Sequence, residues 1–330
     1  MAEEEKKAEN EGLSALREKL LEVLTKCHVS DLEIASKVIV LDSKTDPKKA
    51  IEILLQNKVR AAPVIDTDNN KFIGVLDLRD TVKFALETYK KQSSTLSEIK
   101  QKAMEFLTSS PQITTQSLKY LSQMRKFRTV KNSDTLLSVA QVLAKGSHIV
   151  GVIDEAKNTL SGIITQGQLF QQVSKRWDIN NQEYWNEHQV LLSDLLKLKY
   201  ISQPVKSIKS STKAYDAFEL MSKLDLSGLA VVNNDGKLIH NTSATDIKLW
   251  LIASNTLEES IEQFLINIRK LSLSEKYPIT FCTLDDTFKR ALQKLQATRY
   301  HRLWIVDKDT KPIGVFALTD IFKLLCKSKE

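Results

Sequence analysis

Four residues at matching places along the chain could bind a ligand through their side chains. Asp80, Gln168, Asp246 and Asp320 recur at intervals of 88, 78 and 74 residues, and each opens a segment predicted to be helical. A carboxylate can accept hydrogen bonds from two neighbouring hydroxyl groups of a ligand. It can equally cap the N-terminus of its own helix, which is worth about 1 kcal/mol. A single aspartate would favour the capping role, but three aspartates at one register favour a ligand.

These residues belong to a unit that occurs four times. The first unit reads KVIVLD, DPKKAIEILLQNK, VRAAPVID, FIGVLDLRD and TVKFAL, and the other three follow the same order. Apolar residues at i, i+3, i+4 and i+7 predict the internal helices, as in Leu136, Val139, Ala140 and Leu143 or in Ala217, Leu220, Met221 and Leu224. Short β-branched runs closed by polar turns predict the strands. Each unit is therefore predicted to be β-α-β-β-α.

One such unit of about 60 residues buries little surface by itself, so the units should pack in pairs. The pairing predicts two halves, roughly residues 13–180 and 181–330. The aromatic residues Trp177, Tyr184 and Trp185 lie at the junction and are predicted to pack the connector. The predicted organisation is a flexible acidic tail (1–12), repeat one (13–91), an insertion (92–122), repeat two (123–180), a connector with repeat three (181–255), and a connector helix with repeat four (256–330).

Several function classes lack their signatures in this chain. Only 9 glycines occur in 330 residues, and neither GxGxxG nor GxxxxGK[ST] is present, which argues against a dinucleotide fold and a P-loop. Cys27, Cys282 and Cys326 form no CxxC, and the five histidines form no HExxH. No metal site is therefore expected from spacing. Hydrolase and kinase signatures are also missing, so we do not expect an enzyme.

Membrane and nucleic-acid partners are also not expected. The sequence has no run of 18 apolar residues, and its acidic beginning does not resemble a signal peptide. The formal net charge is +7, and the acidic first twelve residues leave the remainder more basic still. A basic surface attracts anions such as phosphates or an acidic partner. The basic stretch 197–213 carries one aromatic residue and no nucleic-acid-reading motif.

A β-α-β-β-α unit with an aspartate opening its last helix resembles the CBS domain. Two tandem units resemble a Bateman module, and four resemble the gamma regulatory subunits of AMP-activated protein kinase. The resemblance rests on VRAAP from Val59, on the His148 segment HIVGVID and on HRLWIVD from His301. It implies an α+β fold of four CBS repeats, paired into two Bateman modules that form a flattened disc. It also implies a cytoplasmic or nuclear regulatory protein.

The resemblance further implies a non-catalytic subunit with no cofactor, whose regulatory ligands are AMP, ADP and ATP. Its partners would be a protein kinase catalytic subunit and a beta-type scaffold subunit. Within the clefts, the aspartates would bind ribose, basic residues would bind phosphates in a shared central channel, and hydroxyls would assist. The residues that match these roles are Asp80, Asp246 and Asp320 for ribose, Arg60, His148, His301 and Arg302 for phosphates, and Thr165, Ser243 and Thr319 for the hydroxyls.

The chain also departs from this family pattern. Gln168 replaces a ribose-binding aspartate, so its cleft is predicted to be weak or empty. Asp77 and Ala317 stand where a hydroxyl is expected, and Asp225 stands where the family usually has arginine. Asp77 would repel phosphate unless it points to solvent. These departures make the fourth repeat the best candidate. They also leave open a scaffold that has lost its ligand, or a sensor of another adenosyl ligand such as S-adenosylmethionine.

Overall fold

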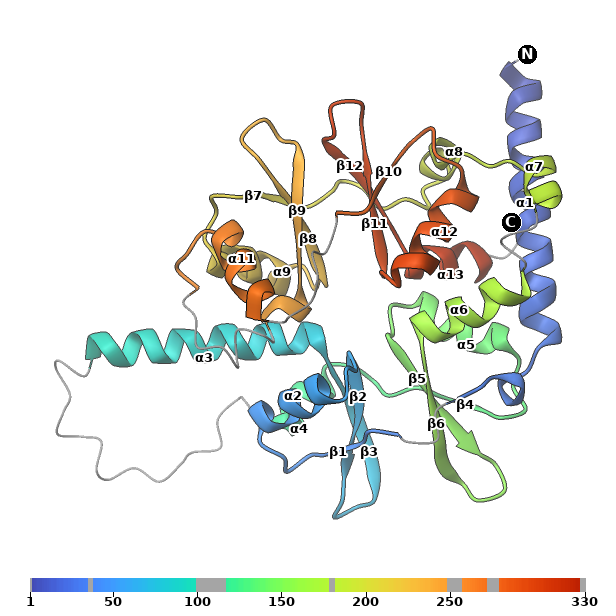
Figure 1. Cartoon of the computed structure of the whole chain (residues 1–330). Coiled ribbons are helices and arrows are strands. Elements are labelled where there is room, and N and C mark those ends of the chain that lie inside the picture. Colours follow the sequence, from blue (N-terminus) through green and yellow to red (C-terminus); the bar gives the residue numbers. More distant parts are fainter. Residues whose placement is uncertain are drawn as a thin grey trace.

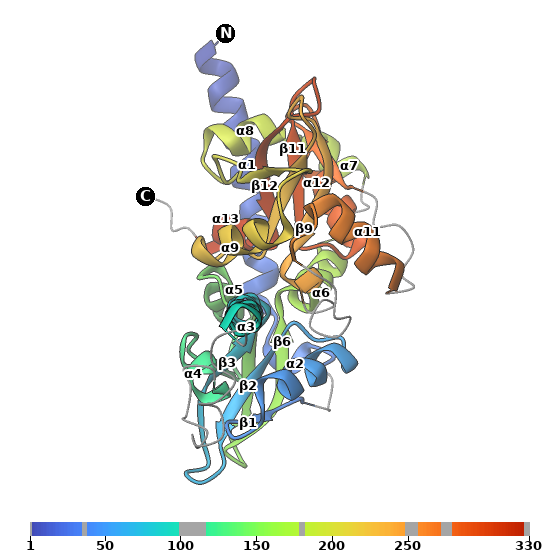
Figure 2. The same ribbon diagram turned by 90° about the vertical axis from the view of Figure 1, so that its left-hand side faces the viewer.

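The four repeats form four separate three-stranded sheets placed around a common centre (Figure 1). The computed structural model describes residues 2–34, 38–98, 117–177, 182–247, 257–271 and 279–326. Viewed from the side, the body is narrower, as expected for a disc of two modules (Figure 2). Within these ranges, no helix has the length and apolar character needed to cross a bilayer.

Each repeat contains the elements that the sequence predicts, in the predicted order. Repeat one consists of β1 (Leu41–Asp42), α2 (Pro47–Gln56), β2 (Ala61–Asp66), β3 (Lys71–Asp77) and α3 (Leu78–Glu98). Repeat two consists of β4 (Thr129–Lys131), α5 (Leu136–Ala144), β5 (Ile149–Asp154), β6 (Thr159–Thr165) and α6 (Gln166–Arg176). Repeat three consists of β7 (Ser207–Lys209), α9 (Ala214–Lys223), β8 (Gly228–Val232), β9 (Leu238–Ser243) and a helical turn at 244–247. Repeat four consists of β10 (Phe281–Thr283), α12 (Phe288–Thr298), β11 (Arg302–Val306), β12 (Pro312–Ala317) and α13 (Leu318–Cys326).

All four sheets share one pairing scheme. The middle strand pairs parallel with the first strand and antiparallel with the third. The same register shift interrupts the antiparallel pair at the same place in every repeat, for example at Val64/Ile65 and Val231/Val232. A parallel pair needs a crossover connection, which the first helix of each repeat supplies. The α+β repeat fold is therefore confirmed.

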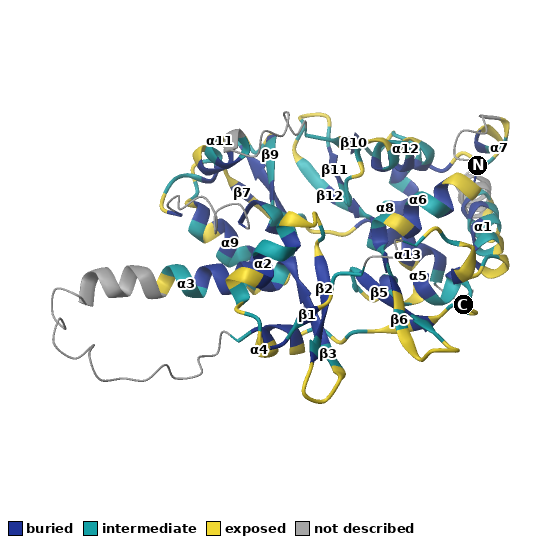
Figure 3. Ribbon diagram, turned by 60° about the horizontal axis from the view of Figure 1, so that its bottom comes forward, coloured by how far each residue is buried: buried dark blue, intermediate teal, exposed yellow. Residues whose placement is uncertain are grey.

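The sheets and the helices make different contacts between repeats. In the first half, Ala61, Val75 and Ile149 bury the sheets of repeats one and two together. Ala230 and Trp304 do the same for repeats three and four. The helices join the halves, because α3 packs on α9 and α5 packs on α13. Helix α11 (Ile261–Leu271) contacts α9 and belongs to the same buried cluster as α3. Buried positions gather where these helices meet (Figure 3). The pairing into two Bateman modules is thus confirmed.

Several segments differ in detail from the predictions. Helix α1 (Ala2–Lys26) includes most of the segment predicted to be a flexible tail, and its Leu16, Leu20 and Leu24 are buried against repeats two and four. The predicted insertion contains the end of α3 and α4 (Leu118–Gln123), while residues 99–116 lie outside the described ranges. On α9, Phe218 is buried, whereas Leu224 follows the end of the helix and is 41% exposed. Helical spacing identifies the face, but the helix end decides the last position.

The connector between the halves is packed by aromatic rings. It carries α7 (Gln182–Glu187) and α8 (Leu192–Lys197). Trp177 lies with its ring centroid 4.9 Å from Trp185 and 6.1 Å from Phe288 of repeat four. Both tryptophans are buried. Burial of these large rings at the junction agrees with the packing role predicted from the sequence.

Candidate functional site

The four residues at the matching register share one local hydrogen bond. A side-chain oxygen of Asp80, Gln168, Asp246 and Asp320 accepts the backbone N–H three residues earlier, at 2.7–3.0 Å. Each lies in the third helical position rather than at the helix opening, so the predicted place is corrected by two residues. This is one half of a capping box. It uses one oxygen of each carboxylate and leaves the other for a ligand or another protein group.

A first cavity, of about 190 Å³, is lined by a carboxyl group together with several basic side chains. Asp246 and Ser243 of repeat three line it with Arg60, His301 and Arg302. We call it the Asp246 cleft. With His148, which also borders it, the cavity brings together six of the predicted residues from all four repeats.

Burial shifts the pKa of the charged groups in the Asp246 cleft. It raises the pKa of Asp246. Desolvation, together with the neighbouring positive charges, lowers the pKa of His301 to about 2 and that of Arg302 to about 10. Arg60 is an exposed residue at the cleft. The surrounding protein nevertheless displaces bulk water from its guanidinium and so lowers its pKa. The low pKa of His301 leaves its imidazole uncharged, so Arg60 and Arg302 supply the positive charge that favours a bound anion.

Two features of the Asp246 cleft were missed from the sequence. Arg269 of α11 lies with Nε 3.9 Å from Oδ1 of Asp246 and donates to the Asn241 carbonyl at 2.6 Å. Arg302 extends over Gly228 and donates to the Ser227 hydroxyl, and a Cβ atom at position 228 would overlap Nη1 of Arg302. Glycine is scarce in this chain, and that scarcity was the one sequence signal that Gly228 is required where it stands.

The ribose position predicted at Asp80 is held by an arginine of the protein itself. Nε of Arg125 lies 3.0 Å from Oδ1 and 3.1 Å from Oδ2 of Asp80. The same guanidinium pairs with Asp225 of repeat three, where Nη1 lies 3.2 Å from Oδ2. Burial raises the pKa of Asp80 to about 7, although Arg125 opposes that shift. Asp225 therefore holds an arginine in place instead of contacting a phosphate.

Asp77 does not point to solvent. Its carboxylate is buried, with Oδ1 3.0 Å from Nε of Arg79 and Oδ2 2.7 Å from Nδ1 of His148. Burial by itself would raise the pKa of Asp77, but the positive charges and hydrogen bonds of His148 and Arg79 outweigh it and hold the pKa well below its usual range. Asp77 thus occupies the Nδ1 side of His148. A second cavity of about 190 Å³, lined by Asp77, Arg79, Arg125 and His148, lies here.

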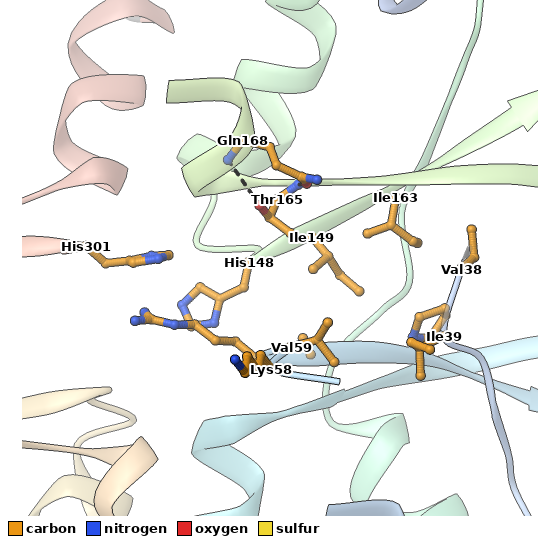
Figure 4. Close-up of a pocket in the computed structure, with 13 residues that line it drawn as sticks. Val38, Ile39, Lys58, Val59, His148, Ile149, Ile163, Thr165, Gln168 and His301 are labelled. Carbon is orange, nitrogen blue, oxygen red and sulfur yellow. Dashed lines mark hydrogen bonds between the residues drawn. The ribbon is translucent and has the colours of Figure 1, made fainter. Parts of the chain in front are cut away.

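A third cavity surrounds Gln168 and is larger, about 330 Å³. We call it the Gln168 cleft (Figure 4). Thr165 and Gln168 lie at one wall, and His148 and His301 point in from the side of the central channel. Arg60 lines this cavity as well as the Asp246 cleft. The two clefts therefore share their basic residues.

The family follows from comparison with known proteins. The CBS domain model matches residues 29–87, 193–253 and 273–327, which together exceed half of the chain. The chain belongs to the CBS domain family. Residues 123–180 lie outside those ranges, but the structure gives this CBS repeat the same elements and pairing as the others. Four CBS repeats in two Bateman modules, as in the gamma-subunit pattern, therefore describe the protein.

Curated relatives of this CBS protein include two kinds of protein. Protein SDS23 of Candida albicans is 25% identical over 305 residues, which cover 84% of this chain and 48% of that protein. The gamma subunit of 5'-AMP-activated protein kinase from Kluyveromyces lactis is 25% identical over 300 residues, covering 89% of this chain and 87% of that subunit. This chain thus spans about half the length of that SDS23 relative.

A solved structure shares the fold of the whole CBS protein. It is an archaeal protein from Methanocaldococcus jannaschii, described as a homologue of the AMP-activated protein kinase gamma subunit, with a TM-score of 0.61. The identity is 18%, and the match covers 87% of this chain and 95% of that chain. At this identity the likeness concerns the arrangement of the repeats alone.

Thr319 and Asp320, the fourth-repeat residues predicted to supply a hydroxyl and to bind ribose, line none of the three cavities. Oδ1 of Asp320 lies 3.4 Å from the Ser202 hydroxyl and 3.5 Å from Nζ of Lys323, and burial raises its pKa. The Thr319 hydroxyl accepts from Gln166 at 3.1 Å. The predicted basic residues Arg60, His148, His301 and Arg302 do converge at the centre. Of the predicted acidic residues, Asp246 is the one that lines a cavity with them.

Proposed function

We propose that this CBS protein is a non-catalytic regulatory subunit that binds AMP, ADP or ATP and transmits the bound state to a protein kinase complex. The observation that carries the proposal is the Asp246 cleft, which one carboxyl group lines together with Arg60, His301 and Arg302. The Kluyveromyces lactis gamma subunit of 5'-AMP-activated protein kinase, which this chain matches over most of its length, supports a kinase complex as the partner. The beta-type subunit is proposed from the family resemblance alone.

The geometry suggests how nucleotides would compete. Asp246 and the Ser243 hydroxyl would accept and donate hydrogen bonds to the ribose. The phosphates would lie among Arg60, His301 and Arg302, where arginine can bind a phosphate through two N–H groups. Arg60 belongs to the first half, and the other two belong to the second. A phosphate group would therefore bridge the halves. Only a ligand whose affinity differs between two arrangements of the halves can shift the partner kinase.

Titration of the full chain with AMP, ADP, ATP and adenosine, followed by thermal unfolding, tests nucleotide binding. AMP at 100 times its dissociation constant should stabilise the fold by about 2.7 kcal/mol. Asp246→Asn should abolish this shift while keeping the capping hydrogen bond, because an amide oxygen can still accept the Ser243 N–H. Asp235→Asn, in an exposed turn, is the matched control. An adenosine shift equal to the AMP shift, or no shift at millimolar nucleotide, would refute the proposal.

A scaffold role for the first half is a second candidate, and the Arg125–Asp80 pair favours it. That pair uses both oxygens of the ribose-binding carboxylate. Binding stoichiometry separates the two roles, because a first half that acts only as a scaffold binds no nucleotide. S-adenosylmethionine, added to the same titration, tests the other adenosyl ligand. Its sulfonium is positive and would be repelled by the central cations, so we expect it to bind far more weakly than AMP.

Co-expression tests the proposed partners. A kinase catalytic subunit and a beta-type subunit from the same source should co-purify with the tagged chain. If neither subunit co-purifies with the tagged chain, the kinase is removed from the proposal, while the proposed nucleotide site is unaffected.

A further inference from the structure

Repeat two differs from the other three repeats in the group placed at the ribose position, Gln168 instead of aspartate. Oε1 of Gln168 accepts the Thr165 N–H at 2.9 Å, as the aspartates do in the other repeats. A backbone N–H can only donate, so the oxygen must face it and Nε2 must be the other end of the amide. The side chain borders the cavity beside Thr165 (Figure 4). A donor thus stands where the other repeats place a carboxylate.

The remaining polar groups of this cleft are also donors. The Thr165 hydroxyl accepts the Gln168 N–H at 3.1 Å, so its own hydrogen can point to a ligand. Helix α6 begins at Gln166, and its N-terminus carries positive partial charge. Lys58, Arg60, His148 and His301 complete the polar lining, and the thirteen described residues around the cavity include no Asp or Glu.

The charge of the Gln168 cleft is not balanced from within. Among the described residues, no hydrogen bond or ion pair holds the guanidinium of Arg60, although the charge of Asp77 acts on it. Burial and neighbouring charges keep the pKa of His301 low and its imidazole neutral, so the positive charge here comes from Arg60 and Lys58. Apolar side chains, including Val38, Ile39 and Ile163, line the end of the cavity away from His301 (Figure 4). A volume of about 330 Å³ is within the range of small-molecule sites. The site therefore suits a ligand with an apolar ring and acceptors at two places.

We propose that the Gln168 cleft binds a nucleotide that carries a second phosphate on its ribose, at the 2′ or 3′ position. The base would lie on the apolar wall, and the ribose phosphate would accept from Gln168 Nε2, Thr165 and the start of α6. The 5′-phosphate would face Arg60 and His301, and this part rests on the proposed function. A carboxylate at the ribose position, as in the other three repeats, would repel such a phosphate. Dinucleotide enzymes separate free from phosphorylated ribose by the same exchange of charge.

Equilibrium dialysis of the full chain tests this inference, with adenosine 3′,5′-bisphosphate, adenosine 2′,5′-bisphosphate and AMP as the probes. Gln168→Glu keeps the length of the side chain and an oxygen for the Thr165 N–H, but adds a negative charge. It should weaken binding of the bisphosphate about tenfold to a hundredfold, the value of one charge-assisted hydrogen bond. Gln172→Glu, one turn further along α6 and outside the cavity, should leave it unchanged.

The outcomes separate this inference from the proposed function. If neither bisphosphate binds, or if Gln168→Glu binds it as tightly as the wild type, the inference is refuted. AMP binding that Asp246→Asn abolishes would then still stand. If a bisphosphate binds and depends on Gln168 while AMP binds nowhere, the proposed function is refuted instead. If Asp246→Asn abolishes bisphosphate binding and Gln168→Glu leaves it intact, the ligand binds in the Asp246 cleft and the inference is refuted.

Discussion

Replacing Arg125 by methionine should expose the charge of Asp80 to an apolar environment without its counter-ion. The side chain of Asp80 is 2% exposed and that of Arg125 is 21% exposed. Two unit charges about 4 Å apart attract by about 4 kcal/mol at an effective dielectric constant of 20. The partial exposure of Arg125 weakens that attraction through solvent screening. We therefore expect Arg125→Met to cost about 2–3 kcal/mol at pH 8.

The cost should depend on pH in a defined direction. The folded-state pKa of Asp80, about 7, is above its unfolded value of 3.8. The folded state then holds more protons between these values, so the contribution of Asp80 to stability falls as the pH rises from about 4 to 7. Removing Arg125 raises that pKa further. The variant should therefore lose more stability at pH 8 than at pH 5, where Asp80 is protonated in both proteins.

Urea unfolding of the full chain at pH 5 and pH 8 measures this effect. Arg128→Met is the matched control, because Arg128 is an exposed cation of the same segment. It should change stability by about 0.5 kcal/mol or less at either pH. An equal loss at both pH values for Arg125→Met, or no loss at pH 8, would contradict the reasoning. The variant also leaves Asp80 open to ribose, so its nucleotide stoichiometry should be equal to or above that of the wild type.

Three further predictions concern other parts of the protein. Gly228→Ala should displace Arg302, and its Cβ atom would also lie 2.8 Å from the Thr242 carbonyl oxygen. We expect AMP binding in dialysis to weaken about tenfold, with normal far-UV circular dichroism. Asp77→Asn should cost about 3 kcal/mol at pH 7 in urea unfolding. Because the folded-state pKa of Asp77 is lowered, the stabilisation by its carboxylate is present above the unfolded pKa and is lost as the pH falls below about 4. If the difference in unfolding free energy between Asp77→Asn and the wild type is the same at pH 3 as at pH 7, the ion pair does not contribute as argued. Trp185→Ala should cost about 3–5 kcal/mol, because its ring is buried against Phe288 where the halves meet; a loss under 1 kcal/mol would show that the junction contributes little.

Most of the fold could be predicted because its signals are local. The helix of repeat two is marked by Leu136 and Val139 at helical spacing, and both are fully buried. The common register of the four aspartate or glutamine positions is also visible in the sequence, since each completes a capping hydrogen bond within three residues. By contrast, the end of α9 before Leu224 depends on where the chain turns away from the core.

The sequence by itself determined the repeats, their order and the residue types that face the centre. Regular apolar spacing and short-range capping depend on neighbours along the chain, so they can be recognised without a structure. Only the tertiary structure decided which carboxylates remain open. Asp80 and Asp246 look alike in sequence, but Asp80 is held by Arg125, which Asp225 contacts from a position 100 residues further along the chain. Burial and charge act through space, so two similar aspartates end in a closed ion pair and in a cleft.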